Sequence, residues 1–194
     1  MTEKQNALLV QKIKLPKLFN SKEQVLDLIE KADPHKESEI LILKFRELQK
    51  HRIPFFLTVD ELEEIFKWKL RGQFHRQTAI RKRNSPQNVI LLTQTAFAIE
   101  HKDEKYETEL KIKILTALSG VEIPVASAIL TLCFPSLYAV IDFKNWRQIY
   151  GPDKKPSYTT KTYNDYLSTI RGYALEFDLT PQEIDMAIWQ LDNN

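Results

Sequence analysis

One aspartate in the second half of the chain, Asp142, stands where a carboxylate could do chemistry. It follows the apolar stretch Tyr138-Ala139-Val140-Ile141 and directly precedes residues 143–150, a helical segment. A carboxylate in this position could stabilise positive charge that develops in a substrate, or act as a general base toward water. Aspartate is also a favoured N-cap of a helix. A purely structural role therefore stays open, and one side chain could serve both.

A run of basic residues precedes this aspartate. Residues 67–83 contain no acid and hold the basic side chains Lys67, Lys69, Arg71, Arg76, Arg81, Lys82 and Arg83. Such a run could follow a nucleic-acid backbone, and the binding would weaken with salt. The alternative is a solvated face, or a set of intramolecular partners for the nearby acids Asp60, Glu61, Glu63 and Glu64.

Several aromatic residues could contact a base. Trp68, Trp146, Tyr163 and Tyr166 have faces on which a nucleobase could stack. Aromatic residues at helical spacing more often belong to a hydrophobic core, and we favour that interpretation for this set.

Other common kinds of site have no matching pattern. The single cysteine, Cys133, cannot make an internal disulfide, a structural zinc site or an iron–sulfur cluster. The histidines are scattered, and neither a glycine-rich phosphate loop nor a nucleophile elbow is present. We therefore expect no metal and no cofactor.

The composition is that of an ordinary globular protein. Hydrophobic residues make up 43% and charged residues 28% of the 194 residues, and the formal net charge is +2. The length suits a single helical domain over residues 1–194, built as two small lobes around one core. Binding to nucleic acid would have to come from local charge. The N-terminus has no signal-peptide pattern, so we expect a cytoplasmic location. The sequence leaves the oligomeric state open.

The elements that must position these residues are helices. Capping-box patterns at Ser21, Thr58 and Thr180 predict the starts of three helices, over residues 21–32, over residues 58–69 and from residue 180 onward. Hydrophobic spacing predicts further helices over residues 37–51, 88–100, 104–118, 123–134 and 159–177. Only residues 10–15 hint at alternation, so the predicted fold class is all-α.

One uncharged stretch, residues 123–141, is long enough to span a bilayer. Pro135 interrupts it after Phe134, because proline lacks an amide donor and disfavours helix in the residue before it. The helical piece that remains is too short to cross. We therefore expect a buried core helix and no membrane partner.

The most informative segment is the short turn Leu118-Ser119-Gly120-Val121 between two helical patterns. Gly120 can adopt the positive φ that so tight a reversal requires. The small residues Ala126, Ser127 and Ala128 allow the second helix to approach the first closely. Backbone amides at such a turn can bind a phosphate, so we expect Ser119, Gly120 and Val121 to contact DNA.

This segment resembles the helix-hairpin-helix motif of the DNA-glycosylase superfamily that includes endonuclease III, with the hairpin over residues 106–134. The family carries a catalytic aspartate at a fixed distance past the second helix, which falls here on Asp142. The resemblance implies a two-lobed helical fold that flips a nucleotide into a pocket. It also implies that Asp142 stabilises positive charge on the sugar or activates water.

The sequence departs from the family pattern at two positions, and both affect the expected activity. The lysine that cuts the strand in bifunctional members is replaced by Pro124, which excludes a Schiff-base lyase at that position. The second hairpin glycine is replaced by Glu122, whose carboxylate repels phosphate. Two other segments, Trp68-Lys69 with Arg71-Gly72 and residues 185–189, resemble segments of bacterial relatives to which no chemistry is attached.

The resemblance therefore predicts a DNA-repair protein, a monofunctional DNA N-glycosylase that removes a damaged base without cutting the strand. Two alternatives stay open. The first is a non-catalytic DNA-binding relative that keeps only the scaffold, which Glu122 and Pro124 favour. The second is a relative that serves protein interaction alone.

Overall fold

The computed structural model describes residues 15–32 and 34–192. Throughout these residues the regular structure is helical and no strand is present, which confirms the predicted all-α class. Of the stretch 10–15, only Leu15 lies within the described residues, and it belongs to no strand.

Most helices follow the ranges that capping residues and hydrophobic spacing predicted. The helix predicted over residues 104–118 stops early, at Leu115, because the chain then enters the hairpin turn. Part of the basic run forms a 3₁₀ helix and a single α-helical turn, which the sequence patterns did not predict. In chain order the elements are α2 (Lys22–Lys31), α3 (Pro34–His51), α4 (Val59–Leu70), η1 (Arg71–Gln77), α5 (Thr78–Arg81), α6 (Pro86–Ala98), α7 (Glu104–Leu115), α8 (Ile123–Cys133), α9 (Phe143–Tyr150), α10 (Thr160–Phe177) and α11 (Pro181–Leu191).

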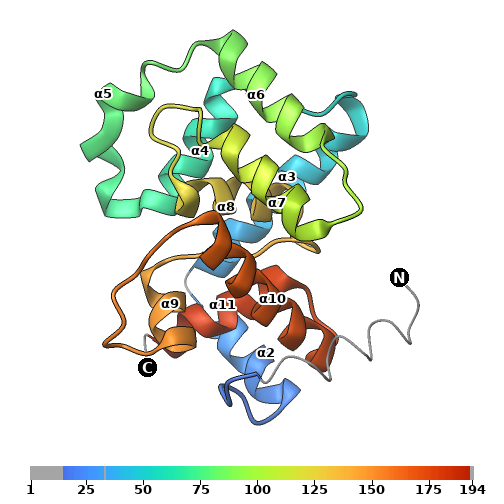
Figure 1. Cartoon of the computed structure of the whole chain (residues 1–194), viewed down its shortest axis with the longest axis vertical. Helices are drawn as coiled ribbons and strands as arrows, with labels where there is room; N and C mark the ends of the chain where they lie inside the picture. Colours follow the sequence, from blue (N-terminus) through green and yellow to red (C-terminus); the bar gives the residue numbers. More distant parts are fainter. Residues whose placement is uncertain (1–14, 33, 193–194) are drawn as a thin grey trace.

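The helices gather in two groups along the long axis of the molecule (Figure 1). In one group α8 packs against α3, α4 and α7, and α6 packs against α4 and α7. In the other group α11 packs against α2, α9 and α10. Helices α7 and α10 join the two groups, and the buried hydrophobic residues form one cluster that runs through both. The second group combines the two ends of the chain, because α2 comes before the first group in sequence but packs against the last helix, α11.

Helix α8 forms the centre of the first group. All its residues from Val125 to Cys133 are buried, as expected of a stretch without charge. The helix ends before Pro135, as predicted. Among the described residues, no helix combines the length and the hydropathy needed to cross a membrane.

The predicted caps are present. The Ser21 hydroxyl accepts a hydrogen bond from the amide of Gln24, and both Thr58 and Thr180 form complete capping boxes. Each cap satisfies amides that the first helical turn leaves without a partner. These local bonds explain why the starts of α2, α4 and α11 were predictable from sequence.

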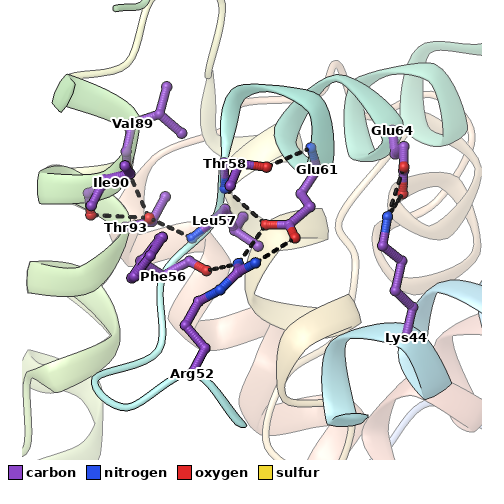
Figure 2. A network of polar contacts seen from close by, with 10 residues as sticks. All are labelled: Lys44, Arg52, Phe56, Leu57, Thr58, Glu61, Glu64, Val89, Ile90 and Thr93. Carbon is purple, nitrogen blue, oxygen red and sulfur yellow. Dashed lines mark hydrogen bonds and ion pairs between the residues drawn. The ribbon is translucent and has the colours of Figure 1, made fainter. Parts of the chain in front are cut away.

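A polar network fixes the connection between α3 and α4 (Figure 2). The Arg52 guanidinium donates to both oxygens of Glu61, at 2.7 and 2.9 Å, and to the carbonyl of Phe56 at 2.7 Å. The amide of Leu57 donates to the Thr93 hydroxyl at 3.0 Å, which ties the same segment to α6. One buried carboxylate thus anchors both the cap of α4 and the end of α3.

We expect Glu61→Gln to lower the free energy of unfolding at pH 7 by about 2 kcal/mol, the usual size for hydrogen bonds to a charged group. Burial raises the pKa of Glu61, but the bonds from Arg52 and Thr58 outweigh it, so the pKa lies below its ordinary value. The stabilisation is therefore present above the unfolded-state pKa of glutamate and is lost as the pH falls through the lower, folded-state pKa.

Denaturant titrations at pH 7 and at successively lower pH would measure this difference. The gap between Glu61→Gln and the unmodified protein should close in acid. Glu64→Gln is a matched control, because Glu64 pairs with Lys44 at 2.6 Å but both side chains are more than a third exposed. That variant should differ by less than about 1 kcal/mol. Equal effects of the two substitutions would contradict the prediction.

Candidate functional site

A small pocket lies between the two groups of helices. Its volume is about 70 Å³, and α4 and η1 line one side while α9 and α11 line the other. Three segments far apart in sequence meet there. The lining residues are Trp68, Lys69, Arg71, Val140, Asp142, Asn145, Asp185, Met186 and Trp189.

Asp142 is the N-cap of α9, as the structural interpretation of the sequence predicted. Its Oδ1 accepts from the amide of Asn145 at 3.0 Å, and its Oδ2 lies 3.3 Å from the Lys69 ammonium. The side chain keeps 24% of its surface exposed. Each carboxylate oxygen can accept more than one hydrogen bond. Asp142 is thus held firmly at the pocket while lone pairs remain for a further partner.

Lys69 reaches this pocket from the last turn of α4. Its side chain is only 10% exposed, and its bond to Asp142 connects the two groups of helices. A partly buried ion pair of this kind gains from the low local dielectric but leaves its partner uncompensated if one side is removed. We had expected Lys69 to contact DNA. In the structure its side chain lines the pocket beside Asp142.

Asn145 sits behind Asp142 and is 1% exposed. Its Nδ2 donates to the hydroxyl of Tyr166 at 2.9 Å, to the carbonyl of Asp185 at 3.1 Å and to the carbonyl of Val140 at 3.4 Å. Its Oδ1 has no partner among the described residues, and neither has the indole Nε1 of Trp68. Two residues of the pocket wall therefore each carry one buried polar atom without a partner among the described residues, an acceptor on Asn145 and a donor on Trp68.

Asp185 supports the loop that leads into Asp142. Its Oδ2 accepts from the amide of Val140 at 2.6 Å, and the residue is 3% exposed. Burial raises the pKa of Asp185 well above its ordinary value. The Val140 amide and Lys69 oppose that shift, while the charge of Asp142 adds to it. The pocket thus contains two carboxyl groups in different environments, one partly exposed and one buried.

Sequence reasoning missed Asn145, Asp185, Met186 and Trp189 as pocket residues. The resemblance to segments of bacterial relatives marked residues 68–72 and 185–189 but predicted no chemical role for either segment. Both segments line the same pocket as Asp142. Residues 185, 186 and 189 lie on one face of α11, so the helical spacing was the signal that could have grouped them.

The predicted helical hairpin is present between α7 and α8. Gly120 has a φ of 84°, which confirms the expected positive angle, and a Cβ there would lie 3.2 Å from the Cγ of Arg81. Two of the three hairpin amides expected to contact phosphate, those of Ser119 and Val121, donate to groups within the protein. The Ser119 amide donates to the Asn84 side chain at 2.8 Å, and the Val121 amide donates to the Leu118 carbonyl at 3.1 Å.

Glu122 adds a second obstacle to phosphate binding at the hairpin. It is the N-cap residue of α8, but its side chain makes no cap hydrogen bond and is exposed. Its negative charge therefore stands at the end of the helix where a phosphate would bind.

The DNA contact expected for Arg81 is wrong. Arg81 is 3% exposed, and its guanidinium bonds to Glu63 at 2.9 Å and to the Phe74 carbonyl at 2.7 Å. The same group lies over the rings of Phe66 and Phe74. All of this holds η1 and α5 against α4, so the intramolecular alternative is correct for this residue.

The other basic residues of the run divide into two kinds. Arg71 is exposed but lies 3.4 Å from Glu37. Lys67, Arg76, Lys82 and Arg83 are exposed on α4, on η1 and at the end of α5. Of the basic residues predicted to bind DNA, four keep the exposure that a phosphate contact requires, namely Arg71, Arg76, Lys82 and Arg83.

Of the aromatic residues, three are core residues and not base-stacking ones. Tyr163 and Tyr166 are fully buried and donate to the carbonyls of Ala139 and Val140, and Trp146 is 2% exposed and donates to the carbonyl of Lys154. This confirms the favoured core interpretation. Trp68 is half-buried and lines the pocket, so it alone of the four remains available to a base.

Within the described part of the chain, no group of three or more histidine, cysteine or acidic side chains could hold a metal ion. Cys133 is buried, and burial raises the pKa of its thiol well above the ordinary value. Comparison of the chain with protein-family models, curated proteins and solved structures found no match.

Proposed function

We propose that this protein is a monofunctional DNA N-glycosylase in which Asp142 is the catalytic carboxylate. The resemblance of the hairpin and its trailing aspartate to the DNA-glycosylase superfamily supports the reaction class. The observation that carries the proposal is the position of Asp142, a partly exposed carboxylate on a pocket between two groups of helices. A carboxylate that served only as a cap would need no such pocket.

The chemistry follows from that position. As the glycosidic bond breaks, its electron pair leaves with the base and positive charge develops on the sugar. The carboxylate of Asp142 stabilises this charge and accepts the proton of the attacking water. The partner Lys69, at 3.3 Å, holds the carboxylate in place.

The flipped base itself requires more room than the small pocket offers. A cavity that holds a single benzene ring measures about 150 Å³, so the pocket of about 70 Å³ admits water but no base. A groove of about 500 Å³ adjoins the pocket and shares Trp68 and Arg71 with it. Its walls include the apolar residues Ile40 and Leu41, and a base could stack there on Trp68.

The protein should release a base without cutting the strand. Pro124 stands in place of the hairpin lysine, so the position from which bifunctional members attack the sugar carries no amine. The test uses labelled duplexes that carry deaminated, oxidised or alkylated bases. Cleavage should occur only after the abasic product is treated with alkali. Strand cutting before that treatment, trapped by borohydride, would contradict the monofunctional assignment.

A second candidate function is DNA binding without catalysis. The observation in its favour is the exposure of Arg76, Lys82 and Arg83 on η1 and at the end of α5, which would bind phosphates without any use of the pocket. This candidate gives salt-sensitive DNA binding and no base release on any duplex. Absence of DNA binding even at low salt would instead favour a protein-interaction role.

In either case, neutralising Lys82 and Arg83 together should weaken DNA binding uniformly across sequences. Each lost phosphate contact should lower the slope of log affinity against log salt by about 0.9. Fluorescence anisotropy over a salt series measures this slope. The double change Lys102→Ala and Lys105→Ala is the control, because both residues are exposed at the start of α7, away from α5. Equal losses in the two double variants would contradict a local binding surface.

A further inference from the structure

The side-chain amide of Asn145 is locked in one orientation. Its Nδ2 faces two backbone carbonyls, those of Val140 and Asp185, and the hydroxyl of Tyr166. That hydroxyl donates its own hydrogen to the Val140 carbonyl at 2.8 Å, so only its lone pairs face Asn145. Turning the amide over would set Oδ1 against two carbonyl oxygens. The network therefore forces an acceptor, Oδ1, to be the end without a partner.

A buried acceptor such as Asn145 Oδ1 requires a hydrogen-bond donor. Leaving it unsatisfied costs about 1–3 kcal/mol, so native structures normally supply a donor. Asn145 lines the same pocket as Asp142, whose carboxylate is also an acceptor. Trp68, in the opposite wall, has a buried indole N–H without a partner among the described residues.

These three groups define the chemistry of the occupant. An occupant that contacts all three groups brings two hydrogens, one for Asp142 and one for Asn145, and a lone pair for the Trp68 indole. The pocket measures about 70 Å³, less than half of the roughly 150 Å³ of a cavity that holds one benzene ring, so it does not admit a nucleobase. Water meets all three conditions, and buried waters typically make about three such bonds.

We infer that the pocket holds the attacking water, with Asn145 as a second catalytic residue that orients it. This inference rests on the proposed function for its catalytic part. The water oxygen forms a bond to C1′ of the sugar, and one O–H bond breaks as its proton passes to Asp142. The other hydrogen stays bonded to Asn145 Oδ1, which receives no proton. The C1′–N bond breaks with its electron pair on the base, which takes a proton from solvent.

A high-resolution crystal structure of the full chain tests the water site without any substrate. An ordered water should lie within about 3.2 Å of both Asn145 Oδ1 and an Asp142 oxygen. An empty site, or Lys69 Nζ bonded to Asn145 Oδ1, would overturn the inference. If the water is present but no duplex yields a free base, the proposed function fails while the water site stands.

Kinetics test the catalytic role. Asn145→Leu removes the acceptor and should slow single-turnover base release by about 10²-fold, because a misplaced nucleophile costs about that much. Asn164→Leu is the matched control, since Asn164 is also a buried asparagine that donates to a backbone carbonyl, that of Lys105 at 3.0 Å, but does not line the pocket. It should lower stability while keeping the rate within a few-fold. Equal slowing in the two variants would mean that Asn145 only supports the fold, and would overturn its catalytic role.

Discussion

Replacing Asp142 by asparagine is expected to slow base release by about 10³-fold while leaving the fold intact. The change removes the negative charge that stabilises the developing cation and the group that accepts the proton of water, and each loss typically costs 10²-fold or more. Asparagine is as good an N-cap as aspartate, so the hydrogen bond to the amide of Asn145 persists. The variant also loses the ion pair with Lys69, which should lower the melting temperature, so the rates are compared at a temperature where both proteins are folded.

Asp103→Asn is the matched control for this experiment. Asp103 caps α7 through bonds to the amides of Lys105 and Tyr106, in the same way that Asp142 caps α9, but it is exposed and does not line the pocket. Base release by the control should match that of the unmodified protein. Full activity of Asp142→Asn would refute Asp142 as the catalytic carboxylate. A similar loss of stability in both variants would identify capping as the whole role of these residues.

Replacing Arg81 by methionine is expected to lower the free energy of unfolding by about 2–3 kcal/mol, the usual size for hydrogen bonds of a charged group, because Arg81 is buried but Glu63 keeps 36% of its side chain exposed. Glu63 would lose its guanidinium, and the Phe74 carbonyl would lose its donor. Methionine keeps the apolar stem that packs beside Gly120 but cannot stack a charge on Phe66 and Phe74. Urea titration measures the difference.

Arg83→Met is the matched control for Arg81, because Arg83 lies two residues further along and is exposed. Its effect on stability should stay within about 0.5 kcal/mol, and its effect should appear in DNA affinity. Substitution of Arg81 should thus change the stability of the protein, and substitution of Arg83 should change its salt-dependent DNA binding. The reverse pattern, with Arg81→Met stable but weak in DNA binding, would contradict the buried position of Arg81.

Of the two carboxyl groups in the pocket, only Asp142 could be predicted as a site residue from the sequence. Asp142 stands out because it follows an apolar stretch and begins a helix, and both features are local. Asp185 lies within α11 and carries no such mark. Its importance comes from the Val140 amide, which lies 2.6 Å away across the fold.

The sequence by itself determined the helices, their caps and the hairpin turn. Thr58, Thr180 and Gly120 act on atoms within a few residues, and the apolar stretch of α8 fixes its own burial. Such effects depend on spacing along the chain, which is visible in the sequence.

Only the tertiary structure decided which polar groups are still available to a ligand. Arg81 and Arg83 look alike in sequence, yet Glu63 and two aromatic rings engage the first and none of these contacts reaches the second. Likewise the pocket joins Trp68, Asp142 and Asp185 from three distant segments. A charge or a hydrogen bond acts over a few ångströms in space, and sequence spacing does not report that distance.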